Sequence, residues 1–359
     1  MKEFNFTYFL MYAFFVFFAL LFALKVDVRR KQAQTLGVLV SVFFMTAIVI
    51  LFGLRDYKVG TDTLMYKYQY TYYKKIDFGT EILVKWFMAF VHGWSNDPRY
   101  YIFSLSALYL LVLYLASLVF SRKFQYNVLF VLFSFVSLYS FQSLGVNIVR
   151  QGVSLAFLLL AVALYLRNPR NVALWLLAAL CSVGFHVTSI AIIVVLILVN
   201  VFRKLPIKYY TVLYFVFVVL AYFKVSLLSL GPVLGDVFAG DRKSKYIDGS
   251  FDKEFSIGFK PQFVIFNTLF LLIFFLIRKY GQKQENYDVL FKTYMALSMM
   301  FFMMFQLPFS DRWGVMSWMF IPFLLAPAFA ENGQYRTSIV SVLFLAIIFV
   351  IFQSMYYQS

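Results

Sequence analysis

Hydrophobic residues fill long uninterrupted stretches of this chain, and short polar or charged segments separate them. The stretches are 4–24, 36–54, 100–120, 127–145, 148–166, 171–185, 187–202, 209–223, 261–277, 289–307, 313–330 and 337–355. Most of them are long enough to cross a bilayer as a helix, which is the element that satisfies its own backbone groups in lipid. The pattern therefore predicts an all-α polytopic membrane protein with about twelve transmembrane helices, formed by one transmembrane domain over residues 1–359.

Composition agrees with this class and removes several others. Hydrophobic residues make up 63% of the chain, far more than in an ordinary soluble domain. One cysteine, Cys181, excludes a disulfide framework, and only two histidines, His92 and His186, argue against a zinc site. No Walker A, Rossmann glycine or HExxH pattern is present. We therefore expect no cofactor and no metal, and substrates that arrive already activated and carried on lipid.

The basic residues predict the orientation of the chain. They cluster at 25–31, 122–123, 167–170, 203–208, 278–292 and 336, in every second loop between the apolar stretches. By the positive-inside rule this side is cytoplasmic, and the segments 55–99 and 224–260 become two long loops on the outer side. Because the positive charge is spread over these loops, the net charge of +16 does not indicate a nucleic-acid partner.

The apolar run 81–94 is short and contains Glu81, Lys85 and His92. We interpret it as an amphipathic helix in the membrane interface, within the first outer loop. A true span here would invert every later loop and turn the basic loops outward. No Asp or Glu lies in the middle of a predicted span, which argues against a proton- or cation-coupled transporter.

The first outer loop carries candidate sugar-binding residues. Thr61, Asp62 and Thr63 offer two hydroxyls and a carboxylate to a polyol, and Gly60 permits a tight turn before them. Tyr66 belongs to a group of tyrosines that suits either sugar faces or a membrane interface.

Three arginines stand at predicted outer helix ends, on the side where the charge pattern disfavours them. They are Arg55, Arg150 and Arg312. Guanidinium groups bind phosphate with two parallel hydrogen bonds, so a convergent trio would suit a diphosphate. The alternative is structural pairing with Asp56, Asp62 or Asp311.

The ordered set of motifs resembles the EpsG-like branch of the Wzy-type polysaccharide polymerases. The motifs are Arg55, Gly60-Thr61-Asp62-Thr63 with Tyr66, Glu81 before an apolar run, Ile148-Val149-Arg150-Gln151, and Phe185-His186. A proline after Glu81, expected in that family, is absent.

The resemblance implies a bacterial inner-membrane glycosyltransferase of GT-C type that acts at the periplasmic face. Such a protein transfers a growing glycan from undecaprenyl diphosphate to the non-reducing end of a lipid-linked repeat unit. Its expected partners are these lipid-linked oligosaccharides, the bilayer and a chain-length regulator protein. An O-antigen ligase and a lipid-linked oligosaccharide flippase remain as alternatives.

For this reaction we expect His186 as the general base, with Asp62 and Glu81 as the carboxylate alternatives. A packing role for His186 stays open. Arg150, with Arg312 or Arg55, would stabilise the leaving diphosphate, and Gln151 and Thr61 would orient sugars or phosphates. Thr63, Tyr66 and Asp311 complete the candidate substrate-binding residues.

Overall fold

The computed structural model describes residues 2–25, 31–226, 257–280, 285–329 and 335–358. In these ranges the regular structure is helical and contains no strand, which confirms the predicted all-α class. Most of the second predicted outer loop, residues 227–256 of 224–260, lies outside the described residues.

Six described helices are long and apolar enough to cross a membrane. They are α1 (Lys2–Lys25), α2 (Lys31–Gly53), α5 (Pro98–Phe124), α8 (Val149–Arg167), α14 (Pro261–Tyr280) and α18 (Tyr335–Gln358). A seventh span is formed if α6 (Val128–Val136) and α7 (Tyr139–Val146) are counted together, although the pair bends by 77°. The multi-pass membrane class is thus supported, while the count of about twelve stays a prediction. Several of the predicted spans were short, and three of them form helices of 13 to 16 residues.

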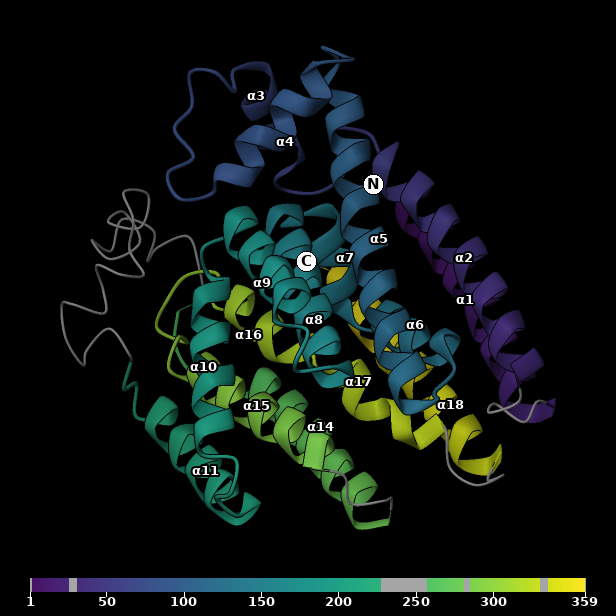
Figure 1. The fold of residues 1–359 in the computed structure, drawn as a ribbon, viewed down its shortest axis with the longest axis vertical. Helices are drawn as coiled ribbons and strands as arrows, with labels where there is room; N and C mark the ends of the chain where they lie inside the picture. The colour runs from purple at the N-terminus through teal and green to yellow at the C-terminus, as the bar shows by residue number, and fades with distance from the viewer. Residues whose placement is uncertain (1, 26–30, 227–256, 281–284, 330–334, 359) are drawn as a thin grey trace. The chain divides into compact units, whose positions relative to one another are not determined.

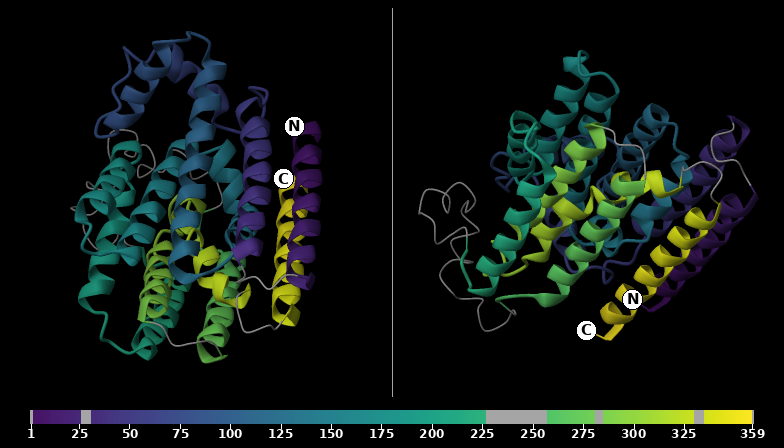
Figure 2. Two further views of the ribbon diagram at one scale, coloured as in Figure 1. Left: turned by 45° about the vertical axis from the view of Figure 1, so that its right-hand side comes forward. Right: turned by 90° about the horizontal axis from the view of Figure 1, so that it is seen from below.

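The chain divides into two compact units, Met1–Ser189 with Leu325–Ser359, and Ile190–Leu324. In the first unit α5 packs on α2 and α8, and α8 packs on α9 (Val172–Phe185). Helices α1 and α18 lie side by side, so both ends of the chain belong to this unit (Figure 2). Gly152 allows α8 to approach α7 closely, since a Cβ there would lie 2.3 Å from the carbonyl oxygen of Leu144.

Two short helices lie beside the N-terminal part of α5 in the first unit (Figure 1). They are α3 (Thr63–Thr71) and α4 (Ile82–His92). With 11 residues, α4 is too short to count among the candidate spans. This length agrees with an interfacial helix, and its position in an outer loop over 55–99 stays a prediction.

The second unit contains most of α10 (Ser189–Val201), then α11 (Ile207–Tyr222), α14, α15 (Glu285–Phe302), α16 (Asp311–Trp318) and most of α17 (Ile321–Leu325). The 3-10 helix η2 (Ala326–Phe329) returns the chain to the first unit. Asn267 links three helices of the second unit, because its side chain accepts a hydrogen bond from Trp318 at 2.7 Å and its carbonyl accepts one from Tyr294 at 2.8 Å. These two hydrogen bonds tie the three helices together within an otherwise apolar interior.

Candidate functional site

One carboxylate of the first unit joins two residues that are far away in the sequence. Oε2 of Glu81 accepts a hydrogen bond from Nη1 of Arg150 at 2.8 Å. Oε1 of the same side chain is hydrogen-bonded to Nδ1 of His186. The partners follow Glu81 by 69 and 105 residues. The structure therefore brings together three residues that the sequence analysis proposed separately.

Each of the three residues lies at a helix end. Glu81 directly precedes α4, Arg150 lies in the first turn of α8, and His186 follows the last residue of α9. Helix α4 approaches α9 so closely that a Cβ on Gly184 would lie 2.6 Å from Cγ of Leu83. A glycine at position 184 is therefore what allows the Glu81 end of α4 to reach His186.

The three side chains are partly open to the surroundings, with exposed fractions of 13% for Glu81, 20% for Arg150 and 25% for His186. Burial raises the pKa of Glu81, but the hydrogen bond with His186 and the charges of His186 and Arg150 outweigh burial and hold that pKa below its usual value. Glu81 is therefore an ionised hydrogen-bond acceptor at neutral pH.

The hydrogen bond between the ionised Glu81 carboxylate and one ring nitrogen of His186 determines which nitrogen carries the proton in the neutral ring. Because Glu81 accepts at Nδ1, the neutral His186 ring is expected to carry its proton there, which leaves the Nε2 lone pair available. Among the described residues, none forms a hydrogen bond with Nε2 of His186. The arrangement is that of a carboxylate-oriented base next to a cation.

Tyr66 connects α3 to the start of α8, one residue before Arg150. Its hydroxyl donates to the carbonyl of Asn147 at 2.8 Å and accepts from the backbone N–H of Val149 at 2.9 Å. Burial raises the pKa of Tyr66, while the positive charge of Arg150 opposes this shift. Tyr66 is thus buried and positions the start of α8, and its expected contact with a sugar stays a prediction.

Asn147 is a residue of the site region that the sequence analysis missed. Its side-chain oxygen accepts from the backbone N–H of Thr61 at 3.0 Å, so it holds the turn that precedes α3. Gly60 in this turn has a φ of +88°, and a Cβ there would lie 2.9 Å from the same oxygen. The signal in the sequence was its position directly before the Ile148-Val149-Arg150-Gln151 motif.

Arg55 is buried, with 8% of its surface exposed, and forms four hydrogen bonds within the first unit. It donates to the hydroxyls of Thr63 at 3.2 Å and Ser106 at 3.1 Å, to the carbonyl of Val146 at 3.1 Å, and to the carbonyl of Phe52. Burial lowers the pKa of Arg55 to about 10, which still leaves it charged at neutral pH. These contacts favour a structural role for Arg55 over the expected binding of a diphosphate.

The remaining candidates of the first unit divide into buried and accessible side chains. Thr63 is fully buried and donates to the carbonyl of Val59 at 2.6 Å, and Gln151 is 4% exposed. Thr61 is exposed, and its hydroxyl donates to Asp62 at 3.2 Å. Only Thr61 and Asp62 of this group are therefore placed where a sugar has ready access.

Asp311 and Arg312 begin α16 in the second unit. The guanidinium of Arg312 lies 4.8 Å from the centre of the Phe309 ring, and Lys260 donates to Ser310 at 2.9 Å. Because Arg312 belongs to the other unit, its convergence with Arg55 and Arg150 stays a prediction. Within the described part of the chain, no three His, Cys, Asp or Glu side chains are grouped to hold a metal ion.

Comparison with known proteins adds the family. The chain has no match among curated proteins and none among solved structures. The sequence model of the EpsG family matches residues 38–359, a range that contains Glu81, Arg150 and His186 and all of the second unit. The match confirms the resemblance seen in the motifs, and the chain belongs to the EpsG family.

Proposed function

We propose that this protein is a polysaccharide polymerase that transfers a growing glycan from undecaprenyl diphosphate to the non-reducing end of a lipid-linked repeat unit. Membership of the EpsG family indicates a membrane protein of the polysaccharide-polymerase kind with glycosyltransferase activity. The GT-C type, the lipid-diphosphate donor and the location of the reaction at the periplasmic face of a bacterial inner membrane are parts of the proposal.

The observation that supports this reaction best is the contact of Glu81 with both Arg150 and His186. Glycosyl transfer from a lipid diphosphate needs a base for the acceptor hydroxyl and a cation for the leaving group. One carboxylate holds a candidate for each role, on helix ends that are partly open.

In the proposed reaction, Nε2 of His186 takes the proton of the acceptor hydroxyl while the hydroxyl oxygen attacks the anomeric carbon of the donor sugar. The new carbon–oxygen bond forms as the bond between the anomeric carbon and the diphosphate oxygen breaks, and the electron pair leaves with the diphosphate. Arg150 stabilises the negative charge that develops there, since Glu81 uses one of its five N–H donors. Glu81 is the positioning residue, and Asp62 remains the alternative base.

The predicted topology places this site on the side opposite the basic loops, where lipid-linked repeat units would be polymerised. Reporter fusions after Arg122 and Arg170 should behave as cytoplasmic, and a fusion after Lys75 as periplasmic. A cytoplasmic signal at Lys75 would overturn the proposed location.

Loss of the gene gives the test of the reaction. A deletion strain should accumulate glycan of a single repeat unit, and the wild-type chain should restore the ladder of long chains on a gel. Loss of all attached glycan would instead indicate a ligase or a flippase. A chain-length regulator, proposed here as a partner, should change the length distribution of the ladder without abolishing it.

A further inference from the structure

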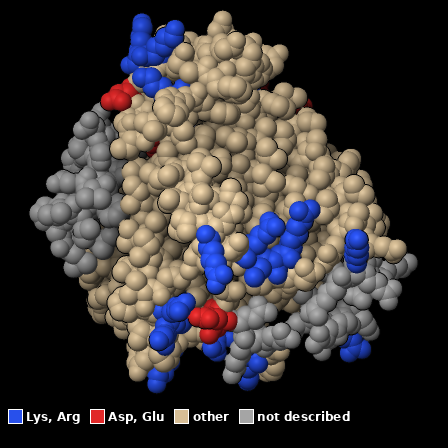
Figure 3. Space-filling view, viewed as in Figure 1, with Lys and Arg blue, Asp and Glu red and all other residues tan. Residues whose placement is uncertain are grey.

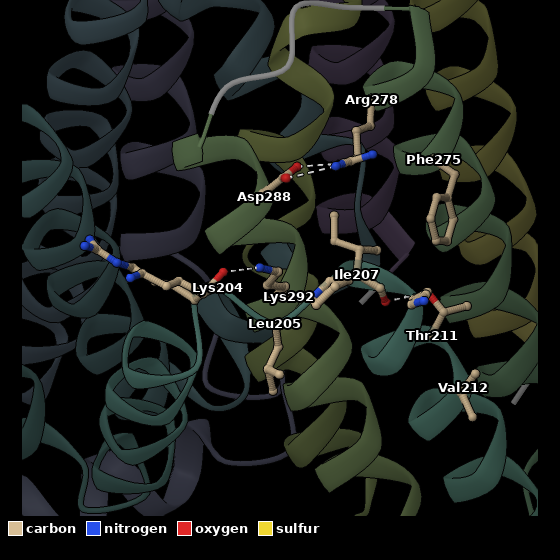
Figure 4. A pocket seen from close by; sticks show the side chains of 12 residues that line it. Lys204, Leu205, Ile207, Thr211, Val212, Phe275, Arg278, Asp288 and Lys292 are labelled. Atoms are coloured by element: carbon tan, nitrogen blue, oxygen red, sulfur yellow. Dashed lines mark hydrogen bonds and ion pairs between the residues drawn. The ribbon is translucent and has the colours of Figure 1, made fainter.

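The second unit contains a basic pocket of about 700 Å³ where α11 begins and where α14 ends beside the start of α15 (Figure 4). Its volume lies in the range of about 300–1,000 Å³ that is usual for ligand sites. Figure 4 shows the pair of Arg278 and Asp288 on one side of the pocket, with Lys292 between them and Val212. None of these residues has a role in the proposed reaction.

Positive charge predominates in this basic pocket. The basic residues that line it are Arg203, Lys204, Lys208, Arg278 and Lys292. Asp288 is the carboxylate of the lining, and Glu285 lies 3.9 Å from Arg203, so five positive charges face two negative ones. In Figure 3 several Lys and Arg side chains surround an acidic group where α11 begins and α14 ends. A surplus of three positive charges selects an anionic ligand.

The carboxylates of the pocket are already engaged. Asp288 accepts two hydrogen bonds from Arg278, at 2.7 and 3.0 Å, and therefore neutralises that guanidinium. Among the described residues, no carboxylate forms an ion pair with Lys204 or Lys208, and both side chains are exposed. Their ammonium groups are available to a phosphate.

Lys292 places a further positive charge inside the pocket wall. Only 4% of its surface is exposed, and its ammonium group donates to the carbonyl of Arg203. That carbonyl belongs to the turn that carries Lys204, so Lys292 holds the turn in place. An ammonium group has three N–H donors, and the carbonyl of Arg203 uses one of those of Lys292. A phosphate oxygen could accept from a remaining donor and neutralise the buried charge in place of a protein carboxylate.

Apolar side chains continue from the basic pocket along the outside of the helices. Leu205 and Val212 line the pocket and are exposed, and Leu276 on α14, which directly follows the lining residue Phe275, is exposed as well. Exposed apolar surface next to a cluster of cations matches a ligand with a charged head and a hydrocarbon tail. A free anion would contact the cations but not the apolar surface.

We infer that the basic pocket binds the phosphate headgroup of an anionic membrane phospholipid, with Lys204, Lys208 and Lys292 at the phosphate and the acyl chains along α11 and α14. The positive-inside pattern puts this end of the second unit on the cytoplasmic side, where anionic lipids attract basic residues. The inference does not depend on the proposed polymerase activity.

The test measures lipid binding to the purified full-length protein by native mass spectrometry in a neutral detergent. We expect phosphatidylglycerol to bind and phosphatidylcholine not to be retained. Replacing Lys204→Gln and Lys208→Gln together should weaken phosphatidylglycerol binding about 25-fold, on the scale of roughly fivefold for each basic residue near an anionic headgroup. The matched control is Lys123→Gln with Lys279→Gln, which removes the same charge from exposed positions outside the pocket lining.

Other outcomes would overturn the inference. Equal loss in the control pair would show general charge attraction without a defined pocket. Competition by inorganic phosphate at the same concentration as the lipid would mean that the site takes a free anion. Binding of a polyprenyl phosphate with no binding of phosphatidylglycerol would assign the pocket to the substrate lipid, and equal binding of phosphatidylcholine would remove the charge argument.

Discussion

Replacing Glu81 by glutamine changes one atom of the site and should reverse the hydrogen bonding of His186. The carboxylate accepts from Arg150 with one oxygen and from His186 with the other. A glutamine amide has one acceptor and one donor group, and arginine can only donate. The amide oxygen should therefore face Arg150, and its NH2 group should face Nδ1 of His186.

This orientation forces Nδ1 of His186 to accept, and the ring proton must then move to Nε2. The proposed base loses the lone pair that would take the acceptor proton. In serine hydrolases the equivalent change from carboxylate to amide lowers kcat about 10⁴-fold. For Glu81→Gln we expect a loss of about 10³- to 10⁴-fold, which corresponds to roughly 4–5.5 kcal/mol of activation free energy.

The assay uses purified variants and lipid-diphosphate repeat units, and it measures chain growth and donor binding separately. Glu81→Gln and His186→Gln should both bind donor and transfer slowly, and the double variant should be no slower than either, because the two residues act as a unit. Asp62→Asn tests the alternative base: if His186 is the base, this variant should stay within about threefold of wild type.

Two results would refute the reasoning. A Glu81→Gln variant with more than a tenth of the wild-type rate would show that the carboxylate does not set the state of His186. A loss at Asp62→Asn as large as that at Glu81→Gln would transfer the role of base to Asp62.

Three further predictions concern charge and stability. Arg150→Lys keeps the charge but loses the planar pair of donors, so chain growth should fall at least tenfold at normal membrane insertion, and a normal ladder would discard Arg150 as the diphosphate ligand. Because the pKa of Glu81 is lowered in the folded protein, its ionised form adds stability above about pH 4.3, and this stability is lost as the pH falls through the folded-state pKa. Below about pH 4.3 the melting temperature of wild type should therefore drop more steeply than that of Glu81→Gln. Parallel curves for the two proteins would contradict this prediction. Arg55→Gln should lower the melting temperature strongly, because the carbonyls of Phe52 and Val146 lose their donor at a cost of about 1–3 kcal/mol each. The control Arg122→Gln, at an exposed position, should not lower it. Equal effects of the two substitutions would argue against a structural role of Arg55.

The hydrophobic pattern was sufficient to find most helices of this chain, including short ones such as α9, α10 and α11, but it did not reveal breaks within a stretch. The predicted stretch 148–166 corresponds closely to α8, Val149–Arg167, because an apolar run bounded by arginines has defined ends. The predicted stretch 127–145 became two helices that bend by 77°, and no proline or charge in it signals the break. A bend of this kind depends on tertiary packing, which periodicity does not record.

The sequence identified the residues of the candidate site individually, but it did not predict which of them contact one another. Glu81 and His186 were proposed as competing bases, since each side chain can accept a proton when it is considered alone. Their pairing depends on the close approach of α4 to α9 at Gly184, a contact between segments about a hundred residues apart. The hydrogen bonds of Arg55 were not predictable for a related reason: its position at a helix end suggested an anion, but its partners Ser106 and Val146 come from distant segments.

The sequence distance between the partners of Glu81 has a consequence for biogenesis. A nascent chain grows at about 5–20 residues per second. His186 lies 105 residues after Glu81, so it is synthesised roughly 5–20 s later. The partners of Arg55 are complete after 91 residues, with Phe52 and Thr63 available at once. The order of synthesis thus allows the Arg55 network to fold around the first loop before the chain has made His186, the last of the three residues of the candidate site. A ribosome stalled just before His186 would hold a membrane intermediate in which the Arg55 network can form. The contact of Glu81 with His186 would still be missing.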